Sequence, residues 1–150
     1  MPLSIEELSD RAEIDQLLAR YCHALDERDW DALRQVFTPD AVHDDTVAGG
    51  FRGRVEEKIE FLKSALEKVM ISQHIVSTTL LELRGDTAYA RSVCQCPMVV
   101  DLGGGKTQVF FQGLWYHDVL VRTPAGWRIS ERVERDYYVH NLPEGFSFQD

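Results

Sequence analysis

The sequence predicts an α+β domain in which helices pack on one face of a strongly curved, mostly antiparallel sheet. Up to about residue 70 the apolar residues recur at helical spacing, and beyond it four stretches are rich in β-branched and aromatic residues. A length of 150 residues suffices for one domain with its own core. Since no repeat or linker divides the chain, we treat residues 1–150 as a single domain.

The first predicted helix begins with a capping pattern. Ser4 is followed three residues later by Glu7, the spacing of a capping box. Apolar residues then recur at the spacing of one helical face. This apolar stripe comprises Ile14, Leu17, Leu18, Tyr21 and Leu25.

Shorter elements follow the first helix. Asp29 is expected to cap a short second helix that includes Phe37 and ends at residues 38–40. A short strand is expected over residues 41–47. A third helix is expected over 55–69, with its apolar residues on one buried face.

The second half of the chain predicts a meander of long antiparallel strands, separated by short turns that contain glycine. The strands are expected at 71–84, 87–102, 106–122 and 127–139. Helices on one face of such a bent sheet enclose a pocket for a small molecule, and Trp115 is a candidate for its wall. The last two strands are apolar on both faces, so we expect the outer sheet face to meet a second subunit in a homodimer or higher homo-oligomer.

Charge and composition exclude several classes of partner. The 16 Lys and Arg residues against 25 Asp and Glu residues give a net charge of −9, which repels nucleic acid and anionic lipid. No apolar run approaches the roughly 20 residues of a membrane helix, and the N-terminus lacks signal-peptide character. Three cysteines in apolar surroundings suggest reduced thiols. We therefore expect a cytoplasmic protein that binds neither nucleic acid nor a membrane.

Two polar residues stand out against this apolar pattern. Asp26 projects from the apolar side of the first helix, where a carboxylate requires a partner, although a role in capping the helix end is an equal alternative. His74 opens the first long strand; most such histidines are ordinary core or surface residues. The family resemblance described next implies that these two elements meet across the pocket, so the residues are expected to form a dyad. The carboxylate would then orient the imidazole as a general base.

Several motifs resemble the SnoaL-like proteins of the nuclear transport factor 2-like superfamily. They are RYCHALDERDWDAL at 20–33, FTPDA at 37–41, GLWYHD at 113–118 and RTPAGWRI at 122–129. The resemblance covers nearly the whole chain and implies the cone-shaped, cystatin-like fold, with three N-terminal helices on the curved sheet. It is weaker for activity, since this fold hosts lyases, isomerases, hydrolases and inert binding modules.

Within that superfamily the chain resembles the scytalone dehydratase and hexachlorocyclohexane dehydrochlorinase group. There, an Asp at the position of Asp26 and a His at that of His74 form the catalytic pair. The resemblance implies a cofactor-independent lyase that abstracts a proton from carbon and expels water or halide from a small hydrophobic, cyclic substrate. Tyr21 and Arg132 fall where the dehydrochlorinase has a Lys and an Arg, so they are the expected polar contacts to substrate.

The sequence also departs from this group. The two tyrosines that hold a water in scytalone dehydratase fall at Leu25 and Asp45. Its second active-site histidine has no counterpart, since no His occurs between His74 and His117. Tyr21 and Asp45, 24 residues apart, instead resemble the phenol and the base of ketosteroid isomerase. This isomerase arrangement is one alternative, and a non-catalytic binding module is another.

A metal site and an organic cofactor are not expected. His43, Asp44 and Asp45, together with His74 or His117, have the residue types of metal ligands. Their spacing matches no known metal motif.

Overall fold

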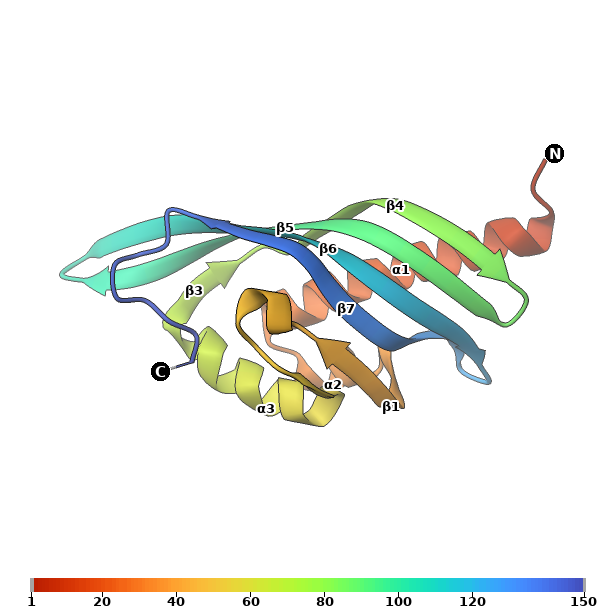
Figure 1. The fold of residues 1–150 in the computed structure, drawn as a ribbon, viewed down its shortest axis with the longest axis horizontal. Coiled ribbons are helices and arrows are strands. Elements are labelled where there is room, and N and C mark those ends of the chain that lie inside the picture. The colour runs from red at the N-terminus through yellow and green to blue at the C-terminus, as the bar shows by residue number, and fades with distance from the viewer. Residues whose placement is uncertain (1, 150) are drawn as a thin grey trace.

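The computed structural model describes residues 2–149 (Figure 1). Its helices are α1 (Ile5–Glu27), α2 (Trp30–Arg34) and α3 (Val55–Ala65), with single 3₁₀ turns at Thr46–Ala48 and Leu66–Lys68. Its strands are β1 (Phe37–Asp44), β2 (Arg52–Arg54), β3 (Val69–Ser72), β4 (Ile75–Arg84), β5 (Thr87–Gly103), β6 (Lys106–Thr123) and β7 (Gly126–His140). The predicted α+β class is thereby confirmed.

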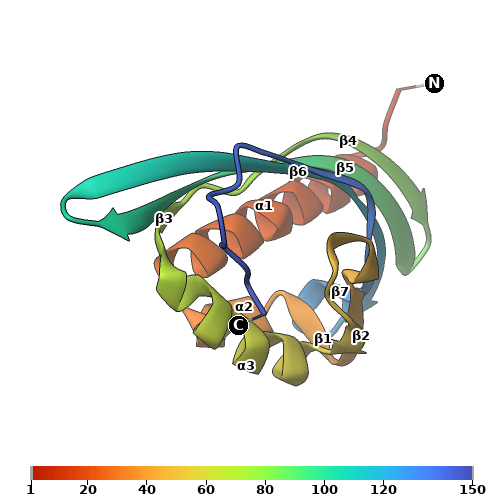
Figure 2. The same cartoon turned by 60° about the vertical axis from the view of Figure 1, so that its left-hand side comes forward.

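All strands belong to one seven-stranded sheet with the order β2-β1-β7-β6-β5-β3, in which β4 also pairs with β5. The pairing is antiparallel except between β1 and β7, which run parallel. The sheet curves over α1, and α2 and α3 lie below the concave side (Figure 2). Apolar side chains of α1 and of the concave face form the core, including Ile14, Leu17, Leu120, Trp127 and Ile129. Within residues 2–149 no helix is both long and apolar enough to cross a membrane.

Both ends of α1 are fixed by identifiable contacts. The predicted capping box is present, because Ser4 accepts from the backbone N–H of Glu7 and the Glu7 carboxylate accepts from that of Ser4. At the other end Arg28 adopts the left-handed conformation, with φ of 60°, and ends the helix. Its guanidinium donates to the carbonyl of Leu25 and to Oγ of Ser72, at 2.8 and 2.9 Å. The last turn of α1 is therefore tied to β3.

Two boundaries differ from the sequence-based expectation. β1 starts at Phe37 and runs through residues 38–40, which were predicted to be a helix stop. Its pairing with β7 is interrupted between Phe37 and Val42, so that Pro39, which has no N–H, lies outside the regular ladder. The third helix ends at Ala65, and the chain is extended again from Val69.

The predicted strand over 71–84 is interrupted at Gln73 and His74. β3 and β4 pair with different parts of β5, Ser72 opposite Met98 and Ile75 opposite Gln95. His74 therefore precedes β4 and lies at the junction between two strands, where its backbone N–H is free to bind a side chain.

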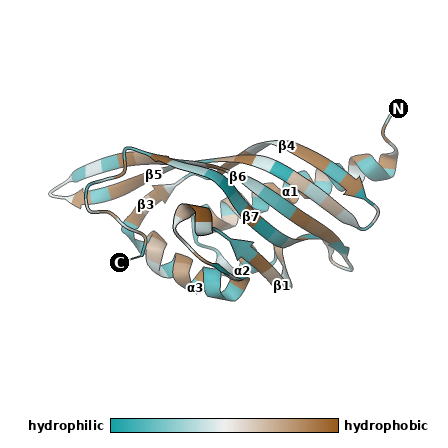
Figure 3. Cartoon of the chain, in the orientation of Figure 1, coloured by the Kyte–Doolittle hydropathy of each residue, from teal (hydrophilic) through white to brown (hydrophobic). Residues whose placement is uncertain are grey.

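The two faces of β6 have different environments. Phe110, Leu114 and Tyr116 are buried on the concave side, whereas Trp115 is 37% exposed on the outer face. Successive side chains of a strand point to opposite faces, so Trp115 cannot share the cavity side with its two neighbours. The prediction that Trp115 forms a wall of the pocket is wrong. Hydrophobic and polar bands alternate along the strands (Figure 3). Exposed apolar side chains also lie on the outer face, including Val109, Phe111 and Tyr138.

Candidate active site

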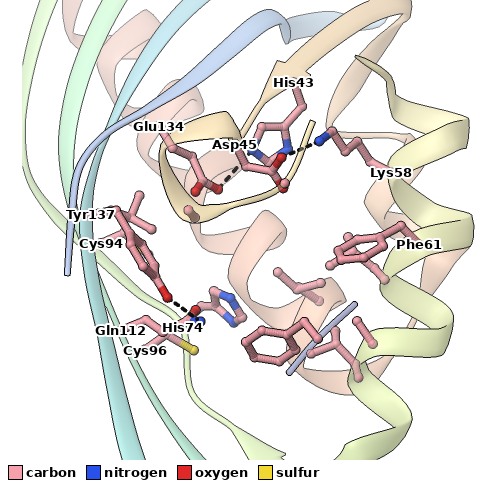
Figure 4. Close-up of a pocket in the computed structure, with 18 of the residues that line it drawn as sticks. His43, Asp45, Lys58, Phe61, His74, Cys94, Cys96, Gln112, Glu134 and Tyr137 are labelled. Carbon is pink, nitrogen blue, oxygen red and sulfur yellow. Dashed lines mark hydrogen bonds and ion pairs between the residues drawn. The ribbon is translucent and has the colours of Figure 1, made fainter. Parts of the chain in front are cut away.

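A cavity of about 110 Å³ lies between α1, α3 and the concave face of the sheet (Figure 4). Its apolar lining includes Leu25, Phe61, Leu62, Leu66, Met98 and Leu114. Among the polar residues on its wall are Tyr21, His43, Lys58, His74, Glu134 and Tyr137. Phe148, from the C-terminal segment, also lines it. An apolar chamber with a few convergent polar groups is the usual form of a small-molecule site.

The structure brings the two leading candidates into direct contact. Nδ1 of His74 lies 2.6 Å from Oδ1 of Asp26, and the backbone N–H of His74 donates to Oδ2 at 2.8 Å. Oγ of Ser72 donates to Oδ1 at 2.8 Å. The His74 side chain is 9% exposed and lines the cavity. The expected pairing of Asp26 with His74 is therefore present.

Burial and hydrogen bonding together determine the ionisation of Asp26 and the tautomer of His74. Burial raises the pKa of the Asp26 carboxyl, but hydrogen bonds from His74 and Ser72 outweigh it, so that the pKa of Asp26 lies below its usual value. An ionised Asp26 accepts the proton of Nδ1 and fixes the imidazole in one tautomer. The Nε2 lone pair of His74 is then left to accept a proton from a ligand.

Tyr21 lines the cavity as expected, but its hydroxyl is engaged. It lies 3.2 Å from the hydroxyl of Tyr116, and burial raises the pKa of Tyr21 well above its usual value. Tyr21 is therefore a neutral phenol on the cavity wall.

Arg132 does not line the cavity. It is fully buried and forms a bidentate ion pair with Asp118, both N–O distances being 2.8 Å. Its guanidinium stacks beneath the rings of Tyr21 and Tyr116, at 4.3 and 3.7 Å from their centroids. The predicted direct contact of Arg132 with a substrate is therefore wrong. Arg132 instead supports the two tyrosines from within the core.

Asp45 also reaches the cavity, and it too is already paired. Its Oδ1 lies 2.5 Å from Nζ of Lys58 and accepts from the backbone N–H of Phe51 at 2.7 Å. Lys58 is 3% exposed and also binds the carbonyl of Phe51. The carboxylate thus fixes the loop before β2. Tyr21 and Asp45 line one cavity, but each has a different partner.

Sequence reasoning missed two further polar pairs on the wall. Nε2 of His43 lies 3.1 Å from Oε1 of Glu134, and Nε2 of Gln112 donates to the hydroxyl of Tyr137 at 3.1 Å. His43 and Glu134 meet because β1 pairs in parallel with β7, a long-range pairing that local periodicity does not reveal. The sequence signal for this pair is limited to the presence of His43 in the strand expected over residues 41–47.

The other groups with metal-binding or nucleophilic chemistry lack a suitable arrangement. Within residues 2–149 no group of three or more His, Cys, Asp or Glu side chains is placed to hold a metal ion. Cys22, Cys94 and Cys96 are buried and form no disulfide. Burial raises the pKa of Cys94 to about 12, so its thiol stays protonated and is a poor nucleophile.

Comparisons with known proteins agree with this architecture. The chain is 46% identical over 132 residues, 88% of each chain, to the uncharacterized protein Rv2910c of Mycobacterium tuberculosis (strain ATCC 25618 / H37Rv). A scytalone dehydratase-like protein from Novosphingobium aromaticivorans superposes with a TM-score of 0.78 at 17% identity, over 93% of this chain and 96% of that one. A hexachlorocyclohexane dehydrochlorinase (LinA) Type2 superposes with a TM-score of 0.73 at 18% identity, over 93% and 97%.

These structural similarities establish the fold. It is the nuclear transport factor 2-like, cystatin-like fold, as the sequence motifs implied. A family model described as the SnoaL-like domain matches residues 6–133, which span both the helices and most of the sheet. The chain therefore belongs to the SnoaL-like domain family of the nuclear transport factor 2-like superfamily.

Proposed function

We propose that the protein is a cofactor-independent lyase that removes water or halide from a small, hydrophobic, cyclic substrate. His74 is the general base and Asp26 is its positioning residue. The observation that carries this proposal is the 2.6 Å contact between Nδ1 of His74 and Oδ1 of Asp26 at the edge of an apolar cavity. The structural neighbours described as a scytalone dehydratase-like protein and a dehydrochlorinase support the same class of reaction.

The reaction needs a proton acceptor and a stabiliser for the charge that develops on the activating group. Nε2 of His74 accepts the proton from carbon. The hydroxyl of Tyr137 accepts its hydrogen bond from Gln112, so its own proton remains available to a substrate carbonyl oxygen. Tyr21 forms the adjoining wall. Asp26, beside His74, stabilises the imidazolium that forms.

The cavity also supports the proposed class of substrate. A buried apolar cavity of about 150 Å³ holds one benzene molecule, so the volume of about 110 Å³ here argues against any substrate larger than a single small ring. The acidic groups on the wall are paired with bases, Asp45 with Lys58 and Glu134 with His43. An uncharged substrate leaves these pairs intact, whereas an ionic one would compete with them.

Turnover by defined variants tests the proposal. Cyclic β-hydroxy and β-chloro ketones with one six-membered ring are suitable probes, and enone formation is followed by ultraviolet absorbance. His74→Gln is expected to abolish the enzymatic rate with the fold retained. His23→Gln, which replaces an exposed histidine of α1, is the matched control and should retain it. An active His74→Gln variant, or wild-type protein that binds the ketones without turnover, contradicts the proposal; the second result favours a non-catalytic binding module.

The isomerase alternative is less well supported. A ketosteroid-isomerase-like mechanism requires Asp45 to move a proton between two carbons. Asp45 is instead held by Lys58 and by the backbone of Phe51. Loss of turnover in Asp45→Asn with full activity in His74→Gln would favour this alternative.

We further propose that the protein acts in the cytoplasm as a homodimer or higher homo-oligomer assembled through the outer sheet face. Val109, Phe111 and Trp115 of β6 are 41%, 45% and 37% exposed there. Apolar surface of this kind favours contact with another subunit. The free cysteines suit a reducing compartment.

A further inference from the structure

A second histidine–carboxylate pair faces the same cavity as His74. His43 on β1 and Glu134 on β7 both line it, with Nε2 of His43 3.1 Å from Oε1 of Glu134. Their side chains are only 9% and 10% exposed. In Figure 4, His43 and Glu134 lie toward one end of the cavity and His74 toward the other. The mechanism proposed above does not use this pair.

Two tyrosines connect the histidines along one wall. The ring centroids of His43 and Tyr116 are 6.5 Å apart, those of Tyr116 and Tyr21 5.8 Å, and those of Tyr21 and His74 6.3 Å. All three contacts are edge-to-face. The two imidazoles are therefore joined along one wall by packed aromatic rings, and both line the cavity that would hold the substrate.

The two carboxylates differ in the hydrogen-bond donors that they accept from. Asp26 accepts hydrogen bonds from the His74 ring, the His74 backbone and Ser72. For Glu134, the side-chain hydrogen bond within residues 2–149 is the one to His43. A buried carboxylate with a single partner stabilises a positive charge on that partner more than one whose charge is spread over three donors. Among the described residues the Glu134 carboxylate is therefore committed to His43, whereas that of Asp26 is shared with Ser72 and the backbone.

We propose that His43 is the general acid that protonates the leaving group, with Glu134 as its positioning residue. This inference rests on the proposed lyase function. Nε2 of His74 takes a proton from the carbon next to the carbonyl, and the electron pair of that C–H bond forms the new C=C bond. The adjacent C–O bond breaks as its oxygen takes a proton from Nδ1 of His43, so that the products are an enone and water. Exchange with water then returns His74 to its neutral form and His43 to its protonated form.

The protonation state of His43 can be measured without turnover. In protein labelled with ¹⁵N-histidine, side-chain nitrogen shifts distinguish an imidazolium from each neutral tautomer, and His43→Gln assigns the signals. The proposed roles require His43 to be an imidazolium in the resting protein and His74 to be neutral with its proton on Nδ1. Glu134→Gln should convert His43 to the neutral form and leave His74 unchanged. A neutral His43 in the wild-type protein overturns the inference.

Leaving-group dependence provides the catalytic test. Hydroxide requires protonation to leave, whereas chloride does not, so the probes are 3-hydroxycyclohexanone and 3-chlorocyclohexanone. Since general acid catalysis contributes about 10²–10⁴-fold, His43→Gln should lose about 100-fold or more on the hydroxy ketone and less than about threefold on the chloro ketone. His117→Gln, which replaces an exposed histidine of β6, is the matched control.

The outcomes separate this inference from the proposed function. An active His74→Gln variant would overturn the lyase proposal itself. An inactive His74→Gln variant, together with a His43→Gln variant that retains wild-type rates on both ketones, would overturn only the role of His43. Equal losses by His43→Gln on both ketones would also contradict a role in protonating the leaving group.

Discussion

The carboxylate of Asp26 binds His74 twice, through the ring at 2.6 Å and through the backbone N–H at 2.8 Å. One side chain therefore fixes the tautomer of the imidazole and also the position of the residue that carries it. The second contact exists because β3 ends at Ser72 and β4 begins at Ile75, which leaves the backbone N–H of His74 outside the sheet. A break in a strand thus positions the candidate base.

Replacement of Asp26 by Asn should separate orientation from folding. An amide accepts the backbone N–H of His74, but its NH₂ group presented to Nδ1 favours the other tautomer, with the proton on Nε2. By analogy with the orienting acid of a catalytic triad, we expect kcat to fall by about 10⁴-fold. The rate is measured on a ketone that the wild-type protein turns over, and circular dichroism monitors the fold. Asp29→Asn makes the same chemical change at the cap of α2, where Asn is equally suitable, and should remain active.

The Asp26 interaction also predicts a pH dependence of stability. Since the pKa of Asp26 is lower in the folded protein, its contribution is fully present above the unfolded value of about 3.9 and is lost as the pH falls through the folded value. Between about pH 5 and pH 2, urea unfolding should show a steeper loss of stability for the wild-type protein than for Asp26→Asn. Parallel curves for the two proteins would contradict this assignment.

The buried ion pair of Arg132 and Asp118 predicts an asymmetric response to mutation. Asp118→Asn leaves the fully buried guanidinium without its counter-charge, so we expect a loss of about 3–5 kcal/mol in the free energy of unfolding. The double variant Arg132→Met with Asp118→Leu removes both charges and should be more stable than the single variant. Denaturant unfolding of the three proteins checks this. A double variant no more stable than Asp118→Asn would show that packing beneath Tyr21 and Tyr116 dominates.

If subunits assemble through the outer sheet face, a charge introduced on that face should disrupt the homo-oligomer. Phe111→Glu places a carboxylate in the proposed subunit interface, so the homo-oligomer should dissociate at micromolar concentration, as measured by light scattering. Leu8→Glu, at a 53% exposed position on α1, is the control and should leave the molecular mass unchanged. A wild-type protein that is monomeric at the same concentration would show that the exposed residues of β6 serve another purpose.

The sequence alone determined the class of fold and the first candidate pair. Helical spacing from Ile14 to Leu25 defined α1, and its capping box defined where the helix begins. Because a helix places residues four apart on the same side, the apolar stripe also predicted that Asp26 would need a partner in the interior. The ranges expected for the last three strands agree closely with β5, β6 and β7. These features depend on local periodicity, which the sequence displays directly.

Tertiary structure alone decided the rest of the site. Alternation in β6 divides its residues into two faces, but only the packing of the helices determines that Tyr116 faces the cavity and Trp115 the outside. Likewise, Arg132 is a core residue because β6 places its ion-pair partner Asp118 directly opposite it. His43 and Glu134 are 91 residues apart and meet through the parallel pairing of β1 with β7. Contacts of this kind arise from the closure of the whole sheet, so no short stretch of sequence encodes them.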